Sequence, residues 1–236
     1  MSTPRLIAGF IRHGDYHQLA DVPSALQPFD LNDQGKSQAL HAASLIKAVL
    51  QKNNWQLFPV VDSSRLLRAW QTAKLITENL TSELDEPAEI QCFDDLAERS
   101  VGAVANLTIE QIEDIVKQDP RYESLPVDWK SNSHFCLPFQ GAESLMSAGE
   151  RVANHVTQQM NQLQNCVTED TVKLFVGHGA AFRHAAFHLG LLNFEQIRQL
   201  SMYHAHPVFL EYIGDKQWRH LAGDWKVRGK SASFTD

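Results

Sequence analysis

The sequence predicts an α/β fold, a single three-layer α/β/α domain with a mainly parallel central sheet. Three observations predict it: short apolar runs that read as buried strands, helical patterns between those runs, and a length of 236 residues, which suits one large domain. The clearest apolar runs are residues 6–11 and 172–176. Strands that alternate with helices pair in parallel and are covered by helices on both faces, so these patterns favour three layers.

The expected elements alternate regularly along the chain. A first strand at residues 5–11 precedes a helix at residues 35–52, where apolar residues recur with helical spacing. A second strand at residues 58–61 ends in Asp62-Ser63-Ser64, which are good N-cap residues for a helix that runs to about residue 80. The remaining expected elements are a strand at 89–93, a helix at 143–163, a strand at 172–176, a helix at 180–189 and a last strand at 207–213.

Two segments depart from this alternation. Residues 104–140 contain one short helical pattern, at residues 108–117, and an irregular stretch with proline and tryptophan. We expect this segment to be an insertion, or lid, over the active site and not a second domain. Residues 215–236 are expected to form a polar C-terminal tail of the same domain, which spans residues 1–236.

Composition excludes several classes of function. The formal net charge is −7, which argues against a nucleic-acid or anionic-membrane binder, because such proteins present a basic surface. No apolar run approaches the roughly 18 residues of a membrane span, and the N-terminus lacks a signal-peptide layout. The 3 cysteines are widely spaced and odd in number, which indicates a reducing compartment without a disulfide framework. We therefore expect a cytoplasmic protein.

Several polar side chains follow predicted strands or begin predicted helices. If the strands are neighbours, their carboxyl ends bring these side chains into one crevice. They are two arginines, two histidines and one carboxylate: Arg12, Arg68, His13, His178 and Glu98. Arginine forks hold phosphate oxygens, a neutral imidazole can attack phosphorus, and a carboxylic acid can protonate a leaving oxygen. The set therefore suits phosphoryl transfer without a metal or other cofactor.

The chain resembles the histidine phosphatases, also called the phosphoglycerate-mutase-like superfamily, from residue 5 to about residue 213. Five motifs in the right order carry the resemblance, and together they are specific although each alone is weak. They are Arg12-His13-Gly14, the stretch from Ser63 to Ala73, the stretch from Leu96 to Gly102, Ala142-Glu143-Ser144-Leu145 and Gly177-His178-Gly179.

The resemblance implies a role for each motif residue. It implies that His13 accepts the phosphoryl group, that Arg12, Arg68 and His178 surround the phosphate, and that Glu98 is the proton donor. Two further substrate-binding candidates come from the residues themselves. A glycine at position 179 lets the backbone approach a phosphate at the start of a helix, and the aromatic ring of Tyr16 is a candidate to line the pocket.

The segment after the first motif departs from the family's mutases and sugar phosphatases. Asp15, Tyr16 and Leu19 stand where those relatives carry Glu, a small hydroxyl residue and Asn, and residues 22–26 lack the expected hydroxyl- and glycine-containing substrate loop. We therefore expect a phosphomonoester hydrolase acting on a small phosphorylated metabolite. The alternatives are a phosphoglycerate mutase, a protein phosphohistidine phosphatase and a non-catalytic binder of phosphorylated ligands. No nucleic-acid or membrane partner is expected, and a homodimer is left open.

Some of these residues also have structural interpretations. Arg68 could form a salt bridge with Asp62 or Glu98, and Glu98 could belong to an exposed carboxylate cluster with Asp94 and Asp95. The remaining histidines are expected to serve packing or loop structure, chiefly His184, His188, His204 and His206, and the alternative for His204 and His206 is a place at the rim of the pocket.

Overall fold

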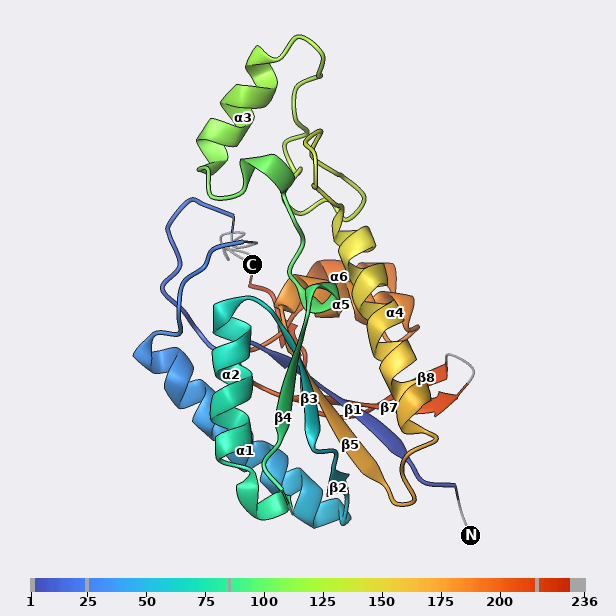
Figure 1. Ribbon diagram of the computed structural model, residues 1–236. Helices are drawn as coiled ribbons and strands as arrows, with labels where there is room; N and C mark the ends of the chain where they lie inside the picture. The colour runs from blue at the N-terminus through green and yellow to red at the C-terminus, as the bar shows by residue number, and fades with distance from the viewer. Residues whose placement is uncertain (1–2, 24–25, 85, 215–216, 230–236) are drawn as a thin grey trace.

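The central sheet of the computed structural model is mainly parallel (Figure 1). The structure describes residues 3–23, 26–84, 86–214 and 217–229, so the expected substrate loop at 22–26 and the end of the chain lie partly outside the described residues. The strands lie in the order β4-β3-β5-β1-β7-β8, and β2 also pairs with β5. Strands β1, β3, β4 and β5 are parallel, whereas β7 and β8 are antiparallel at one edge. The strand bounds are β1 Leu6–Arg12, β2 Gln56–Leu57, β3 Val60–Ser64, β4 Glu89–Phe93, β5 Thr171–Gly177, β7 Val208–Gly214 and β8 Gln217–Ala222.

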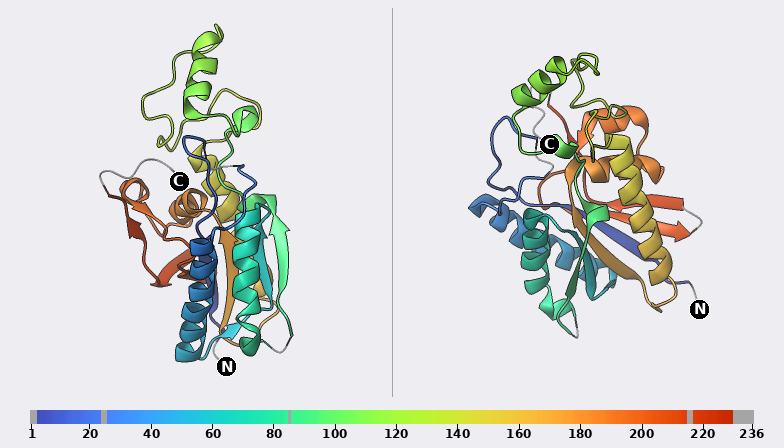
Figure 2. Two further views of the ribbon diagram at one scale, coloured as in Figure 1. Left: turned by 90° about the vertical axis from the view of Figure 1, so that its left-hand side faces the viewer. Right: turned by 45° about the horizontal axis from the view of Figure 1, so that its top comes forward.

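Helices cover both faces of the sheet, which confirms the three-layer prediction (Figures 1 and 2). On one face, α1 (Asp33–Asn53) and α2 (Leu67–Glu78) pack against Ile7 and Ile11 of β1. On the other face, α4 (Leu145–Leu163) and α5 (Gly179–His188) pack against Ala8 and Phe10. Successive side chains of a strand point to opposite faces, so β1 contributes to both layers of core and is buried along its whole length.

The predicted N-cap of the helix after the second strand is wrong. Asp62, Ser63 and Ser64 belong to β3, where they pair with β4, and the N-cap of α2 is Leu66, which makes no side-chain capping bond. All three polar residues are fully buried, and pairing along β4 continues the strand to Ser64. The Ser64 hydroxyl is consequently placed at the carboxyl edge of the sheet.

The segment expected to form a polar tail contains strands that the sequence analysis did not predict. Residues Gln217–Ala222 form the edge strand β8, where Trp218 packs on Tyr212 of β7 with ring centroids 4.9 Å apart. Further on, β9 (Lys226–Val227) pairs with β6 (Leu200–Ser201), which follows the short helix α6 (Phe194–Gln199). Aromatic packing and edge pairing hold this segment on the domain, although most of its side chains are polar or partly exposed.

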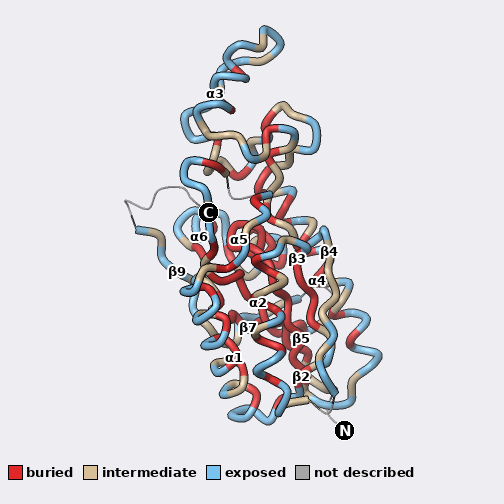
Figure 3. The backbone as a smooth tube through the Cα atoms, turned by 60° about the vertical axis from the view of Figure 1, so that its left-hand side comes forward, coloured by how far each residue is buried: buried red, intermediate tan, exposed pale blue. Residues whose placement is uncertain are grey.

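The insertion rises beyond the carboxyl edge of the sheet (Figure 1). It contains α3 (Ile109–Gln118) and a small core of its own around Ile112 and Trp129. Much of its backbone is exposed or intermediate, in contrast to the buried sheet (Figure 3). A bridge between Val101 and Ala142 closes its base. Three short 3₁₀ turns complete the elements: η1 Thr81–Glu83, η2 Asp94–Leu96 and η3 Gly102–Val104.

Candidate active site

The predicted convergence of strand ends is present in the structure. Strands β3, β5 and β1 are adjacent in the sheet. His13 directly follows β1, His178 directly follows β5, and Arg68 lies in the first turn of α2, after β3. The rings of His13 and His178 have centroids 5.1 Å apart, and Arg68 contacts both rings. Together with Arg12, these residues form a buried cluster that we call the cage.

Hydrogen bonds fix the orientation of the His13 ring. Its Nδ1 lies 2.7 Å from the carbonyl oxygen of Gly14, and Nε of Arg68 lies 3.2 Å from its Nε2. A carbonyl accepts and a guanidinium donates, so the proton resides on Nδ1 and the Nε2 lone pair faces Arg68. Burial, and then the charges of Arg68, His178 and Arg12, hold the pKa of His13 well below its usual value. The imidazole is therefore neutral.

Arg68 is the centre of the cage. Its Nη1 donates to the carbonyl of Gln27 at 2.9 Å, and its Nη2 donates to Nδ1 of His178 at 3.3 Å. The guanidinium also lies over the Tyr16 ring, 4.6 Å from the centroid. The suggested salt bridge with Asp62 is wrong, because Asp62 points to Lys173 inside the domain at 2.6 Å.

His178 is positioned by a residue that the sequence interpretation missed. Its Nε2 lies 2.9 Å from the hydroxyl of Ser64, at the end of β3. Since Nδ1 accepts from Arg68, Nε2 carries the proton and donates to Ser64. Burial, followed by the charges of Arg68 and Arg12, holds the pKa of His178 well below its usual value.

Arg12 crosses the start of α5. Its Nη1 donates to the carbonyl of Met202 at 3.0 Å. A Cβ atom at position 179 would lie 3.0 Å from Cδ of Arg12, so Gly179 leaves the room that the arginine occupies. The predicted glycine is thus explained first by its contact with Arg12.

Glu98 is buried, so its assignment to an exposed carboxylate cluster is wrong. It is 6% exposed, whereas the neighbouring Asp94 and Asp95 are exposed. Its carboxylate oxygens accept hydrogen bonds from the backbone N–H groups of Ala180 and Ala181, at 3.2 and 3.1 Å. These groups begin α5, next to His178, and a carboxylate is favourable at a helix N-terminus. The structure therefore places Glu98 beside the cage.

Tyr16 packs edge-on against His13, with ring centroids 5.3 Å apart. Its hydroxyl is buried and has no hydrogen-bond partner among the described residues, and burial raises the pKa of Tyr16. The ring therefore lies against His13 and Arg68 of the cage.

Thr72 and His204 also contact His13 or the residue after it. The Thr72 hydroxyl accepts from the N–H of Gly14 at 3.0 Å, which fixes the backbone after His13. The His204 ring lies 5.7 Å from that of His13, between centroids, so His204 reaches the cage, the less favoured of the two interpretations that the sequence left open for it. Thr72 and Ser64 lie in the second motif, but neither was assigned a role at the site from the sequence, whereas a histidine just before the last strand was a visible signal.

The described residues offer neither a metal centre nor a membrane segment. Among them, no group of three or more His, Cys, Asp or Glu side chains is arranged to hold a metal ion. None of the helices in the described part of the chain is both long enough and apolar enough to cross a membrane.

A comparison with known protein families shows which family the chain belongs to. The sequence profile of the Histidine phosphatase superfamily (branch 1) matches residues 9–224. The chain belongs to this superfamily. The resemblance drawn from the sequence is confirmed, as is the expectation of an enzyme of the histidine phosphatase class. Among curated proteins, none matches the chain.

Solved structures share the fold of this histidine phosphatase. A mycobacterial glucosyl-3-phosphoglycerate phosphatase has 20% sequence identity and a TM-score of 0.66, over 94% of this chain and 99% of that one. The alpha-ribazole phosphatase of Shigella flexneri has 18% identity and a TM-score of 0.68, over 96% and 100% of the two chains. At such low identity these likenesses show the fold alone.

Proposed function

We propose that this protein is a metal-independent phosphomonoesterase that works through a phosphohistidine at His13. The observation that carries the proposal is the neutral, buried His13 ring whose Nε2 lone pair faces the Arg68 guanidinium. A phosphate dianion held by that guanidinium would be presented to the nucleophilic nitrogen. Arg12 and His178 complete the set of donors around it, so the positive charge that a metal often supplies would come from side chains.

The proposed reaction has two steps. His13 Nε2 attacks phosphorus, the bond from phosphorus to the leaving oxygen breaks, and the carboxylic acid of Glu98 gives its proton to that oxygen. The Glu98 carboxylate then takes a proton from water, and the resulting hydroxide attacks the phosphohistidine. Inorganic phosphate leaves, and His13 is neutral again. Glu98 must turn from the N–H groups of α5 toward the leaving oxygen to play this part.

A small phosphorylated metabolite is the proposed substrate. The buried Tyr16 ring and the lid would enclose it. The names of the solved neighbours, a glucosyl-3-phosphoglycerate phosphatase and an alpha-ribazole phosphatase, support this class of substrate. We further expect a cytoplasmic location, since Cys92, Cys136 and Cys166 are free thiols.

Replacing the nucleophile tests the proposal. His13→Ala should abolish hydrolysis of 4-nitrophenyl phosphate, while circular dichroism shows a folded protein. His41→Ala, which removes an exposed histidine from α1, is the matched control and should keep full activity. Rapid-quench labelling with radioactive phosphate should give an acid-labile, base-stable phosphoenzyme with the parent protein only. Full activity of His13→Ala would overturn the mechanism.

Two further measurements separate this function from its alternatives. Treatment with EDTA should leave the rate unchanged, and a strict requirement for divalent metal would contradict the proposal. With 3-phosphoglycerate as substrate, isomerisation faster than phosphate release would assign a mutase instead. Hydrolysis confined to a phosphohistidine-bearing protein would assign a protein phosphatase, and tight binding of phosphorylated ligands without turnover would assign a binder.

A further inference from the structure

Helix α4 holds the backbone just before Glu98. Arg151 lies on α4 and donates from its guanidinium to three carbonyl groups of that segment. They belong to Asp94, Asp95 and Ala97, and the Nη1 atom lies 3.2, 2.7 and 3.2 Å from their oxygens. These residues form or follow the 3₁₀ turn η2, and the last carbonyls of such a turn have no partner inside it. One guanidinium therefore binds the carbonyl groups at the end of the turn.

Glu143 holds the backbone on the other side of Glu98. Its Oε1 accepts from the N–H of Ser100 at 3.0 Å, and its own N–H donates to the carbonyl of Ser100, also at 3.0 Å. Glu143 also pairs with Arg151: Nη2 lies 2.6 Å from Oε1, and Nε lies 3.3 Å from Oε2. We call this pair of Arg151 and Glu143 the clamp. It binds residues 94–97 at one end and Ser100 at the other.

The Glu98 carboxylate is held in a different way from the backbone around it. It accepts from the N–H groups of Ala180 and Ala181 at the start of α5, and from the N–H of Arg99. In the proposed reaction this carboxyl group turns toward the leaving oxygen. Rotation about side-chain bonds moves a carboxyl group without moving the backbone. A backbone that is held in place therefore determines which positions the carboxyl group reaches.

We propose that the clamp positions Glu98 as the proton donor, with Arg151 as its main residue. This inference rests on the role proposed for Glu98 above. Proton transfer requires the acid to lie within hydrogen-bond reach of the leaving oxygen, and a misplacement of about 1 Å can lower the rate about 100-fold. Without the clamp, residues 94–100 shift more freely and the acid reaches that oxygen less often. Arg151 acts through Glu98, so it is a positioning residue.

The effect of the clamp should depend on the leaving group. 4-Nitrophenolate is a weak base and departs with little help from an acid, whereas an alkoxide is a strong base and needs the proton. The measurement is the ratio of kcat/KM for 4-nitrobenzyl phosphate, which releases an alcohol, to kcat/KM for 4-nitrophenyl phosphate. Both values come from one preparation, so a partly unfolded sample does not alter this leaving-group ratio.

The ratio also separates the clamp from the electrostatics of the cage. The charge of Arg151 contributes, after burial and the cage arginines, to the lowered pKa of His178. An effect of Arg151 through the cage would change both substrates alike, because both carry the same phosphate group. The leaving-group ratio would then stay constant.

Two variants break the clamp from its two ends. Arg151→Gln should lower the leaving-group ratio at least about tenfold. Glu143→Ala releases Ser100 and should lower the ratio as well, which keeps the test valid if Arg151→Gln does not fold. The matched control is Arg219→Gln on β8, which breaks another pair of an arginine with a glutamate and should leave the ratio unchanged.

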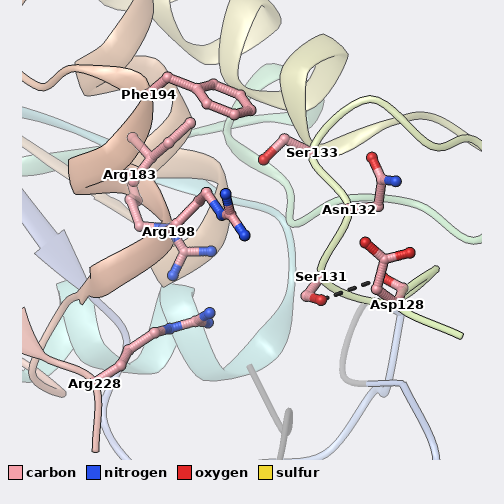
Figure 4. Close-up of a pocket in the computed structure, with 9 residues that line it drawn as sticks. Asp128, Ser131, Asn132, Ser133, Arg183, Phe194, Arg198 and Arg228 are labelled. Atoms are coloured by element: carbon pink, nitrogen blue, oxygen red, sulfur yellow. Dashed lines mark hydrogen bonds between the residues drawn. The ribbon is translucent and has the colours of Figure 1, made fainter. Parts of the chain in front are cut away.

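A second control separates the clamp from the attachment of the lid. The lid segment 128–133 faces α5 and α6 across a pocket, and the Ser133 hydroxyl lies 3.0 Å from Nε2 of His184 on α5 (Figure 4). Ser133→Ala should leave the leaving-group ratio unchanged, because residues 94–100 stay bound to the clamp. If Ser133→Ala lowers the ratio as much as Arg151→Gln, a loosened lid explains the effect and the inference is overturned.

Replacing the acid itself distinguishes a failure of this inference from a failure of the proposed function. Glu98→Gln should lower the leaving-group ratio most. If it leaves the ratio unchanged, Glu98 is not the proton donor, and the proposed reaction fails together with the clamp. If Glu98→Gln lowers the ratio but the folded variants of the clamp do not, the positioning role is overturned and the phosphatase proposal stands.

A double variant tests whether Arg151 acts through Glu98. In protein that already carries Glu98→Gln, adding Arg151→Gln should change the leaving-group ratio by less than about twofold, because the group that Arg151 positions is gone. A further fall of about tenfold in the double variant would show that the two residues act independently, and it would overturn the inference.

Discussion

Two buried polar clusters occupy the same two strands and differ in the partners of their charges. Inside the domain, Asp62 of β3 accepts from Lys173 of β5 at 2.6 Å and lies 2.9 Å from Nε2 of His155. Toward the carboxyl edge, β3 ends at Ser64 and β5 leads into His178, which joins the cage.

The difference lies in what each buried cation contacts. Lys173 faces a carboxylate, so its charge is balanced inside the protein. Arg68 donates to two imidazole nitrogens and a carbonyl oxygen, and none of these three acceptors is negatively charged. A balanced buried pair serves the structure, whereas a cation that donates to neutral, oriented imidazoles suits an incoming anion. Burial of polar groups alone therefore does not mark the functional cluster.

Removing the cation of the cage should have the largest effect. Arg68→Ala should lower kcat/KM for 4-nitrophenyl phosphate about 10³-fold, because the cation that faces the developing charge is lost. Lys74→Ala is the matched control on the same helix, since Lys74 is exposed and pairs only loosely with Glu78. Steady-state kinetics and thermal melting of both variants check this. If unfolding explains the loss of activity of Arg68→Ala, the proposed difference between the cage and the interior pair of Asp62 and Lys173 is contradicted.

Removing the cation of the interior pair should act on stability instead. Lys173→Met should lower the free energy of unfolding by about 3 kcal/mol, because it leaves the Asp62 carboxylate buried without its ion partner. The folded fraction should keep its specific activity. Lys36→Met, which breaks an exposed pair with Asp33, should change stability by less than about 0.5 kcal/mol. Urea unfolding measures both, and an equal effect of the two variants would contradict the comparison.

The sequence predicts the cage better than its supports, for a physical reason. Parallel strands share a carboxyl edge, so the pattern along the chain predicts that His13, Arg68 and His178 lie together if their strands are neighbours, and in the structure β3, β5 and β1 are neighbours. The carbonyl of Gln27 and the hydroxyl of Ser64 carry no such signal. Every residue has a carbonyl, so the sequence does not single out that of Gln27. A serine is compatible both with an N-cap and with a strand, so the sequence does not fix the place of Ser64.

Some elements of the fold could not be predicted from the sequence either. Helix α6 has 6 residues, too few for a helical period to be visible. Strand β8 is an edge strand with polar residues on its exposed side, so it resembled a tail. For Glu98, expected to be the proton donor, a surface carboxylate cluster stayed open as an alternative because its burial depends on α5, where its partner Ala181 lies 83 residues further along the chain.

The neutral histidines predict a pH dependence of stability. Burial lowers the pKa of His184 to about 3, and lowers those of His13 and His178 as well. The unfolded chain binds protons at histidine below about pH 6.5 while the folded protein does not, so this stabilisation is complete above that pH and is lost as pH falls toward about 3. From pH 6.5 to 5, His184 alone should cost about 2 kcal/mol.

Urea unfolding at several pH values checks this linkage. His184→Gln should flatten the fall in stability between pH 6.5 and 5 by about 2 kcal/mol. His41→Gln, at an exposed position on α1, should leave the slope unchanged. A parent protein whose stability rises on acidification over this range would have the opposite sign and would show that these rings are charged when folded.

The smallest expected effect on the rate comes from removing the Ser64 hydroxyl, which supports His178. This change tests whether a buried serine affects the rate only where it contacts the cage. Ser64→Ala removes the acceptor 2.9 Å from Nε2 of His178 and should lower kcat about tenfold, because the ring is left free to turn. Ser63→Ala is the matched control: Ser63 is equally buried, but its hydroxyl bonds to the Ser64 carbonyl and not to the cage. Ser64→Thr keeps the hydroxyl and should restore most of the rate. If Ser63→Ala is as harmful as Ser64→Ala, strand packing and not the orientation of His178 sets the rate.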